Sequence, residues 1–109
     1  MTELQQLTEK IVAFRNERDW EQFHTSKDLA IALSVEASEL LELFLWKGNE
    51  EVNIETLKDE LADVMIYSLF LANKHNLNIH DIIENKIKKN AAKYPVEKAR
   101  GNAKKYLDL

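Results

Sequence analysis

One stretch of the sequence, LKDELADVMIYSLFL at residues 57–71, decides the fold. Its apolar residues fall on nearly every side of a helix, which predicts a largely buried helix over about residues 54–75. Such a helix has more apolar surface than its neighbours in so small a chain can cover, so we expect part of it to face another subunit. Its acidic residues Glu60 and Asp63 are three apart and therefore project from one face, with Tyr67 a turn further along.

Three more helices are expected around this one. Apolar residues recur at spacings of three and four over residues 4–14, which predicts a first helix that ends near Arg18. A second helix is expected from an N-cap at Ser26 to about Leu45, before Gly48 interrupts the pattern. Asn53 is then a suitable cap for the central helix.

The fourth helix is expected from Asn78 or His80 to about Lys93, where Tyr94-Pro95 ends it because the residue before a proline avoids helical angles. A basic and mostly irregular tail, about residues 94–109, should follow. Four helices with short connections predict an all-α fold, an antiparallel four-helix bundle, with residues 1–109 as a single domain.

Composition supports this class and excludes several others. The chain has 109 residues, 45% of them hydrophobic, with 2 Gly, 1 Pro and no Cys. The lack of cysteine excludes disulfides, thiolate metal sites and a cysteine nucleophile. Scarce Gly and Pro argue against an all-β fold, and neither glycine-rich phosphate-binding motif is present. No apolar stretch reaches the roughly 20 residues that span a bilayer, so we expect a soluble cytoplasmic protein that does not bind a membrane.

Charge is unevenly distributed along the chain. Residues 84–106 contain eight basic and two acidic residues, a net charge of +6, whereas the remainder carries −10. The basic segment could bind nucleic acid, although we do not expect a nucleic-acid partner, and it could equally bind a polyphosphate held through a metal on the acidic part of the chain. A solvated Lys-rich helix end is the alternative without a function.

The acidic part contains a carboxylate where the pattern predicts an apolar residue. Glu36 lies in phase with Leu33 and Leu40, and Glu39 follows three residues later on the same side. Two antiparallel helices would therefore bring Glu36 and Glu39 close to Glu60 and Asp63. Four carboxylates at close range repel one another unless they bind protons or divalent cations. An all-oxygen ligand set favours Mg²⁺, Mn²⁺ or Ca²⁺, and Mg²⁺ commonly takes substrate phosphates as further ligands.

At this point the sequence resembles a known family. The pattern Glu36-x-x-Glu39, twenty residues, then Glu60-x-x-Asp63 is similar to the metal motif of the all-α, MazG-like nucleoside triphosphate pyrophosphohydrolases. Further stretches resemble the dCTP pyrophosphatase branch of that family: RDWEQFH at 18–24, ELFLW at 42–46, DVMIY at 63–67, residues 86–90 and YPV at 94–96. Val35 stands where MazG proteins usually carry another Glu, a departure that this branch shares.

The resemblance implies a function and a role for each matching residue. It implies hydrolysis of a nucleoside triphosphate, dCTP or a related pyrimidine nucleotide, to the monophosphate and pyrophosphate by a homo-oligomer, a dimer or a tetramer. Mg²⁺, or Mn²⁺ in its place, would be held by the four carboxylates, and Glu39 would orient or deprotonate the attacking water. The residues implied to contact the substrate are Trp20, His24, Trp46, Tyr67, Lys86, Asn90, Tyr94, Arg100 and Lys104.

Three alternatives stay open at this point. A di-iron or di-manganese bundle would need two Glu-x-x-His motifs, and the chain has one, Glu21-x-x-His24, in an expected loop. A non-catalytic helical module that binds through the basic C-terminal arm would leave Glu36 unexplained. A MazG-like hydrolase of another pyrophosphate compound fits the same residues.

Overall fold

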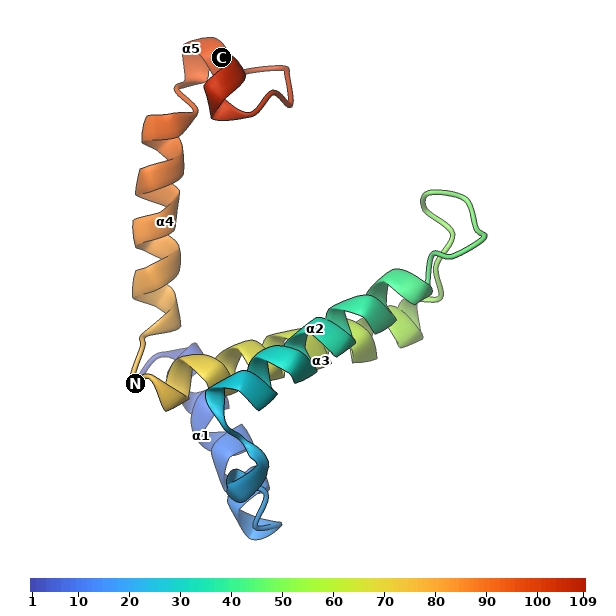
Figure 1. Ribbon diagram of the computed structural model, residues 1–109, viewed down its shortest axis with the longest axis vertical. Coiled ribbons are helices and arrows are strands. Elements are labelled where there is room, and N and C mark those ends of the chain that lie inside the picture. The colour runs from blue at the N-terminus through green and yellow to red at the C-terminus, as the bar shows by residue number, and fades with distance from the viewer. The chain divides into compact units, whose positions relative to one another are not determined.

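The computed structural model describes all residues, 1–109, and the chain divides into two compact units, Met1–Leu77 and Asn78–Leu109. Every regular element is a helix (Figure 1). The elements of the first unit are α1 (Glu3–Glu17), the 3-10 helix η1 (Glu21–Phe23), α2 (Ser26–Glu42) and α3 (Ile54–Lys74). Those of the second are α4 (Ile79–Lys93), the single-turn α5 (Val96–Ala99) and the 3-10 helix η2 (Tyr106–Asp108). The predicted all-α class with four long helices is confirmed.

Short polar side chains begin each long helix. Thr2, Thr25, Asn53 and Asn78 have extended backbones, and each side-chain oxygen accepts a hydrogen bond from the amide three residues later. Asn53 and Asn78 are therefore the caps that the sequence predicts. The prediction of Ser26 as the cap of α2 is wrong by one residue, because the Thr25 hydroxyl accepts from the Asp28 amide at 3.1 Å and Ser26 is already helical.

The second helix ends three residues earlier than predicted. From Leu43 to Leu45 the backbone amides bond to carbonyls three residues back, a tightened turn that closes α2 at Glu42. Trp46 then adopts a positive φ of 63°, a conformation that a large side chain rarely takes. The tail contains two short helical turns, α5 with four residues and η2 with three, and the rest of it is irregular.

α2 and α3 lie side by side as an antiparallel hairpin, and α1 packs against α3 (Figure 1). The Ser26 hydroxyl and the His75 Nε2 lie 2.9 Å apart and join the start of α2 to the end of α3. The buried apolar side chains gather toward this end, where α1 also packs: Leu29, Leu69, Phe70 and Ala72. None of the helices combines the length and the apolar character needed to cross a membrane.

The central helix is less buried in this chain than its sequence predicts. Leu61 and Met65 of α3 are 49% and 45% exposed. The neighbouring helices of the first unit thus leave a sizeable apolar surface on the α2–α3 hairpin, with Ile31, Val35 and Leu41 also exposed on α2.

Candidate active site

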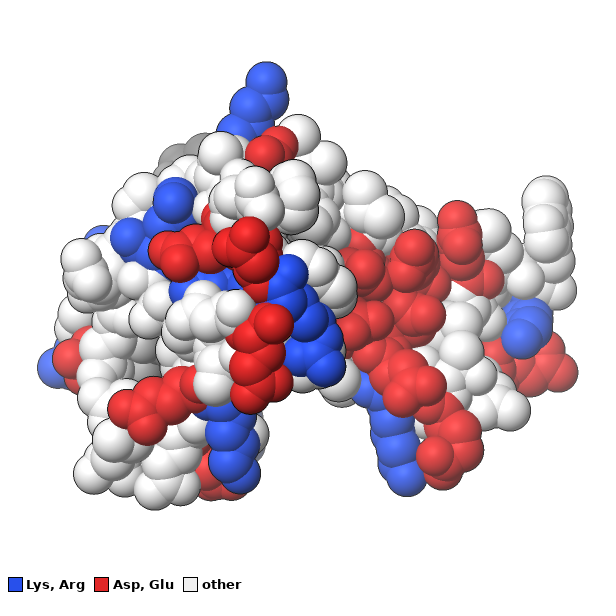
Figure 2. Space-filling model, turned by 90° about the horizontal axis from the view of Figure 1, so that it is seen from below, with Lys and Arg blue, Asp and Glu red and all other residues white.

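The four predicted carboxylates meet where α2 and α3 run side by side. Oxygen atoms of Glu36 on α2 and of Glu60 and Asp63 on α3 all lie within 4.8 Å of one another. Glu39, one turn after Glu36, acts on both Glu36 and Glu60 through its charge and through hydrogen bonding. We call these four residues the carboxylate cluster. Figure 2 shows that Asp and Glu side chains gather densely on one part of the face drawn there.

Two carboxyl groups of the cluster, those of Glu36 and Glu60, have a raised pKa and so hold a proton more tightly than usual. Burial raises the pKa of Glu36 to about 7, and the Glu39 carboxyl adds to this rise through a hydrogen bond and its charge. Burial also raises the pKa of Glu60, where Glu39 again contributes. Without a cation, the cluster therefore reduces its mutual repulsion by retaining protons near neutral pH.

Two oxygen atoms of the cluster lack a partner in the protein. The Oε2 atoms of Glu36 and Glu60 are buried and accept no hydrogen bond. A buried carboxylate oxygen without a partner is costly unless a proton or a cation satisfies it. Three carboxylate oxygens within 4.8 Å of one another, with no nitrogen or sulfur beside them, are the ligand type that Mg²⁺, Mn²⁺ and Ca²⁺ prefer.

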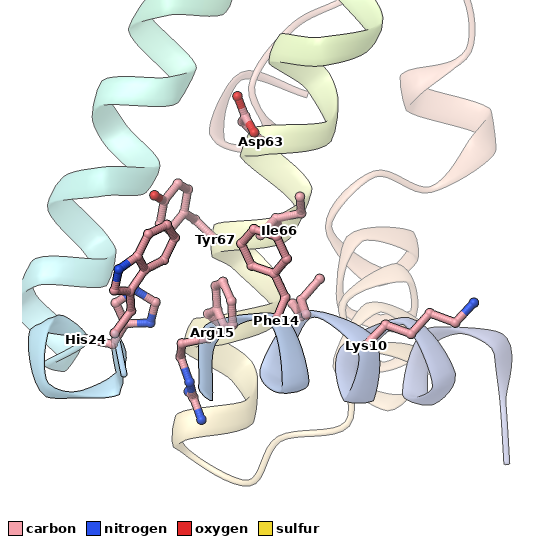
Figure 3. A pocket seen from close by; sticks show the side chains of 10 residues that line it. Lys10, Phe14, Arg15, His24, Asp63, Ile66 and Tyr67 are labelled. Atoms are coloured by element: carbon pink, nitrogen blue, oxygen red, sulfur yellow. The ribbon is translucent and has the colours of Figure 1, made fainter. Parts of the chain in front are cut away.

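A cavity of about 450 Å³ opens beside the cluster and shares Asp63 with it (Figure 3). It lies between α1, α3 and the two residues that flank η1, Trp20 and His24, and most of its wall is apolar or aromatic. Its volume is in the range of pockets that hold small organic ligands, about 300–1,000 Å³. Its lining residues are Lys10, Ile11, Phe14, Arg15, Trp20, His24, Asp63, Ile66, Tyr67 and Phe70.

Aromatic contacts hold the wall of this cavity in place. The Phe14 and Trp20 rings meet edge to face with centroids 5.9 Å apart, and the Arg18 guanidinium lies 3.6 Å from the centre of the Phe14 ring. Tyr67 connects the cavity to the cluster. Burial raises the pKa of its hydroxyl, and the charge of Glu36 adds to that effect.

The structure brings together only some of the residues predicted to contact a substrate. Trp20, His24 and Tyr67 line the cavity. Trp46 does not line it and is fully exposed in the loop between α2 and α3. The other five lie in the second unit, so their roles stay predictions: Lys86 and Asn90 on α4, Tyr94 at its end, and Arg100 and Lys104 beyond α5.

Several residues of the wall were not predicted as site residues. Ile11 and Phe14 belong to the apolar stripe of the first helix, which is the usual signal for core packing. Ile66 and Phe70 are part of the continuous apolar run of α3 and give no separate signal. Arg15 is the least expected, because it is a cation that is only 8% exposed.

Comparisons with known proteins agree with this geometry. Residues 31–109 match the model of the MazG-like family. The chain is 40% identical over 104 residues to dCTP pyrophosphatase 1 of Mus musculus and 38% identical to that of Homo sapiens. Each match covers 88% of this chain and 61% of the relative, so the chain spans about three fifths of the length of these mammalian proteins.

A solved structure extends the likeness to three dimensions. The crystal structure of a pyrophosphatase from Archaeoglobus fulgidus superposes with a TM-score of 0.77 at 34% sequence identity. The match covers 87% of this chain and 94% of that one. The family match includes all four residues of the carboxylate cluster, and the shared fold extends over most of both chains. This chain belongs to the MazG-like family.

Proposed function

We propose that this protein is a Mg²⁺-dependent nucleotide pyrophosphohydrolase that converts a nucleoside triphosphate, in the first instance dCTP, to the monophosphate and pyrophosphate. The observation that carries the proposal is the carboxylate cluster, with its unpartnered buried oxygens, next to an aromatic cavity that shares Asp63 with it. A nucleotide has the same two parts, an aromatic base and a polyphosphate that binds divalent cations. The relatives named dCTP pyrophosphatase support the choice of substrate.

The residues of the cluster fit a Mg²⁺ site. Glu36, Glu60 and Asp63 offer three oxygens within reach of one ion, and Glu39 lies beside them. When bound, Mg²⁺ neutralises charge that builds up on the phosphates and helps to align them. Mn²⁺ has similar ligand preferences and is the alternative ion.

Glu39 is our candidate for the catalytic base. It follows Glu36 by one helical turn, and its charge contributes to the raised pKa values of both Glu36 and Glu60. A water molecule held there would lose a proton to Glu39 as its oxygen attacks phosphorus. The bond between the phosphorus and the bridging anhydride oxygen then breaks, and pyrophosphate departs with the electron pair.

The cavity would hold the nucleobase. Trp20 offers a flat surface for stacking, and His24 and Tyr67 carry polar atoms on the same wall. A triphosphate attached to a base in this cavity would extend past Asp63 toward the cluster.

We also assign substrate contacts to residues of the second unit. Lys86 and Asn90 are four apart on α4 and therefore share a face, and Arg100 and Lys104 add positive charge near Tyr94. We assign this group to the phosphates and Trp46 to the base. The compartment that best suits a nucleoside triphosphate substrate is the cytoplasm, which cell fractionation would test.

A homo-oligomer is also part of the proposal. Single exposed apolar residues are ordinary, but here they recur along both helices of the hairpin, with Leu41 as much as 65% exposed. A second copy of the chain packed on this surface would bury residues that the neighbouring helices of the first unit leave exposed.

Replacing Glu39 by Gln should lower the turnover of dCTP by about 10²–10⁴-fold, because an amide cannot accept the proton of the attacking water. Release of pyrophosphate in the presence of Mg²⁺ measures this, with other nucleoside triphosphates tested in parallel. Glu42→Gln, an exposed acid at the end of the same helix, should keep its turnover. Equal activity of Glu39→Gln and wild type would remove the assigned role, and a wild-type protein inert on every triphosphate would remove the function.

Replacing Trp20 by Ala should raise the KM for dCTP about tenfold, because stacking on one base is worth about 1–3 kcal/mol. Steady-state kinetics measure this change. The matched control is Phe23→Ala, which removes an exposed aromatic side chain of η1 that does not line the cavity. If both variants keep the wild-type KM, the base does not bind against Trp20.

Light scattering should give a molar mass at least twice the 12.7 kDa of one chain. Leu61→Lys should shift the protein toward the monomer, because it places a charge on the exposed apolar surface of α3. Thr56→Lys, a charge at an exposed polar position of the same helix, should leave the mass unchanged. A mass of one chain for the wild type at micromolar concentration would contradict the proposal.

A further inference from the structure

A second cavity, about 220 Å³, lies on the other side of Arg15 and His24 from the carboxylate cluster and its aromatic cavity. Its wall is mostly polar, and four of its lining residues carry basic, acidic or amide side chains besides His24. The volume is below the range of about 300–1,000 Å³ usual for drug-sized ligands, so a small ion suits it better than a nucleotide. The lining residues are Arg15, Glu21, His24, Leu29, Asn73 and Lys74.

Arg15 is the main feature of this cavity. The residue is only 8% exposed, yet no carboxylate lies within hydrogen-bond distance of its guanidinium. Its Nε donates to the Asn16 side chain at 3.0 Å, whereas its Nη2 lies 3.8 Å from Glu21 Oε2, beyond hydrogen-bond distance. Figure 3 shows the guanidinium pointing away from Tyr67 and Asp63. Its terminal donors are thus available on the side opposite the aromatic cavity.

The other charges around the cavity also favour an anion. Lys74 lines it and forms no ion pair. Glu21 is the only acid among the lining residues, and its side chain is 69% exposed, so it can turn into solvent when an anion takes its place. The cavity touches the first turn of α2 but also the last turns of α1 and α3, so the helix dipoles add no net positive potential here. Any positive potential in the cavity therefore comes from the side chains of Arg15 and Lys74.

The pKa of His24 is affected by these neighbouring charges. Burial lowers the pKa of its imidazole, and the charges of Arg15 and of Lys74 each lower it by more than Glu21 raises it. The ring is therefore neutral at pH 7, and with the proton on its buried, unpartnered Nδ1 it can donate a hydrogen bond.

We propose that the cavity lined by Arg15, His24 and Lys74 binds a small tetrahedral oxyanion of the phosphate type. Such an ion has several acceptor oxygens, and the cavity offers several donors for them. These donors are the Arg15 guanidinium, the Lys74 ammonium, the Asn73 amide and the neutral His24 imidazole. The site is separate from the carboxylate cluster, and it shares Arg15 and His24 with the aromatic cavity. Binding of the anion does not depend on the proposed hydrolysis.

The test is a titration of the protein with inorganic phosphate after a chelating resin has removed metals. Sodium chloride keeps the ionic strength constant, and the side-chain ¹⁵N signals of Arg15 Nε and of the His24 ring report binding at this cavity. Both signals should shift and saturate with phosphate and with sulfate. Acetate, a planar oxyanion of lower charge, should cause much smaller shifts.

Three variants sharpen the test. Lys74→Gln should weaken phosphate about fivefold, since it removes one charge of the cavity and does not touch the aromatic cavity. Glu21→Gln should tighten binding by a similar factor, because it removes the competing acid. Lys58→Gln, an exposed lysine on the same helix as Lys74, is the matched control and should bind as the wild type does. Shifts that do not saturate, or equal affinities of Lys74→Gln and Lys58→Gln, would overturn the proposal.

Discussion

Repulsion among four carboxyl groups is the interaction on which the rest of this site depends. Glu36, Glu39, Glu60 and Asp63 are brought together by two helices whose apolar side chains pack them side by side. The packing of the two helices thus holds these carboxyl groups closer together than they would lie if they were free in water. A bound proton or a bound cation lowers this repulsion, and the pKa of Glu36 is raised by burial first and by the neighbouring carboxyl groups in addition.

The position of the cluster explains the arrangement of its surroundings. Asp63 belongs to both the cluster and the aromatic cavity, so a ligand in the cavity lies next to any cation held by the acids. Tyr67 follows Asp63 by one helical turn and extends the same face. An aromatic base and a charged polyphosphate would therefore be bound by adjacent surfaces of one helix, α3, with α1 and α2 each completing one of them.

The sequence predicts the cluster well because the signal is local and physically unusual. Glu36 interrupts an apolar stripe, and helical spacing alone places Glu39, Glu60 and Asp63 on faces that antiparallel packing brings together. The caps of α3 and α4 follow from the preferences of asparagine. The one-residue error at α2 has an equally local cause, since Thr25 and Ser26 are both good caps and only the backbone decides between them.

The rest of the site depends on contacts that the sequence does not encode locally. Ile11 and Phe14 follow an ordinary core pattern, so their place in the cavity wall depends on how α1 packs against α3. No pattern in the sequence around Arg15 predicts that this residue is buried. Trp46 and the basic residues from Lys86 to Lys104 are matched by the family resemblance rather than by geometry. Their positions relative to the cluster depend on contacts between parts of the chain that are distant in sequence, and a helical pattern does not specify such contacts.

The most direct test of this account is the free energy of unfolding of metal-free protein between pH 5.5 and 8, compared with Glu36→Gln. The pKa of Glu36 is raised to about 7 in the folded protein, so its protonated form favours folding, and that contribution is lost as the pH rises through about 7. The wild type should therefore lose more stability than Glu36→Gln, and Mg²⁺ should restore it at pH 8 in the wild type alone. Parallel pH profiles for both proteins, with no effect of Mg²⁺ on either, would contradict the account.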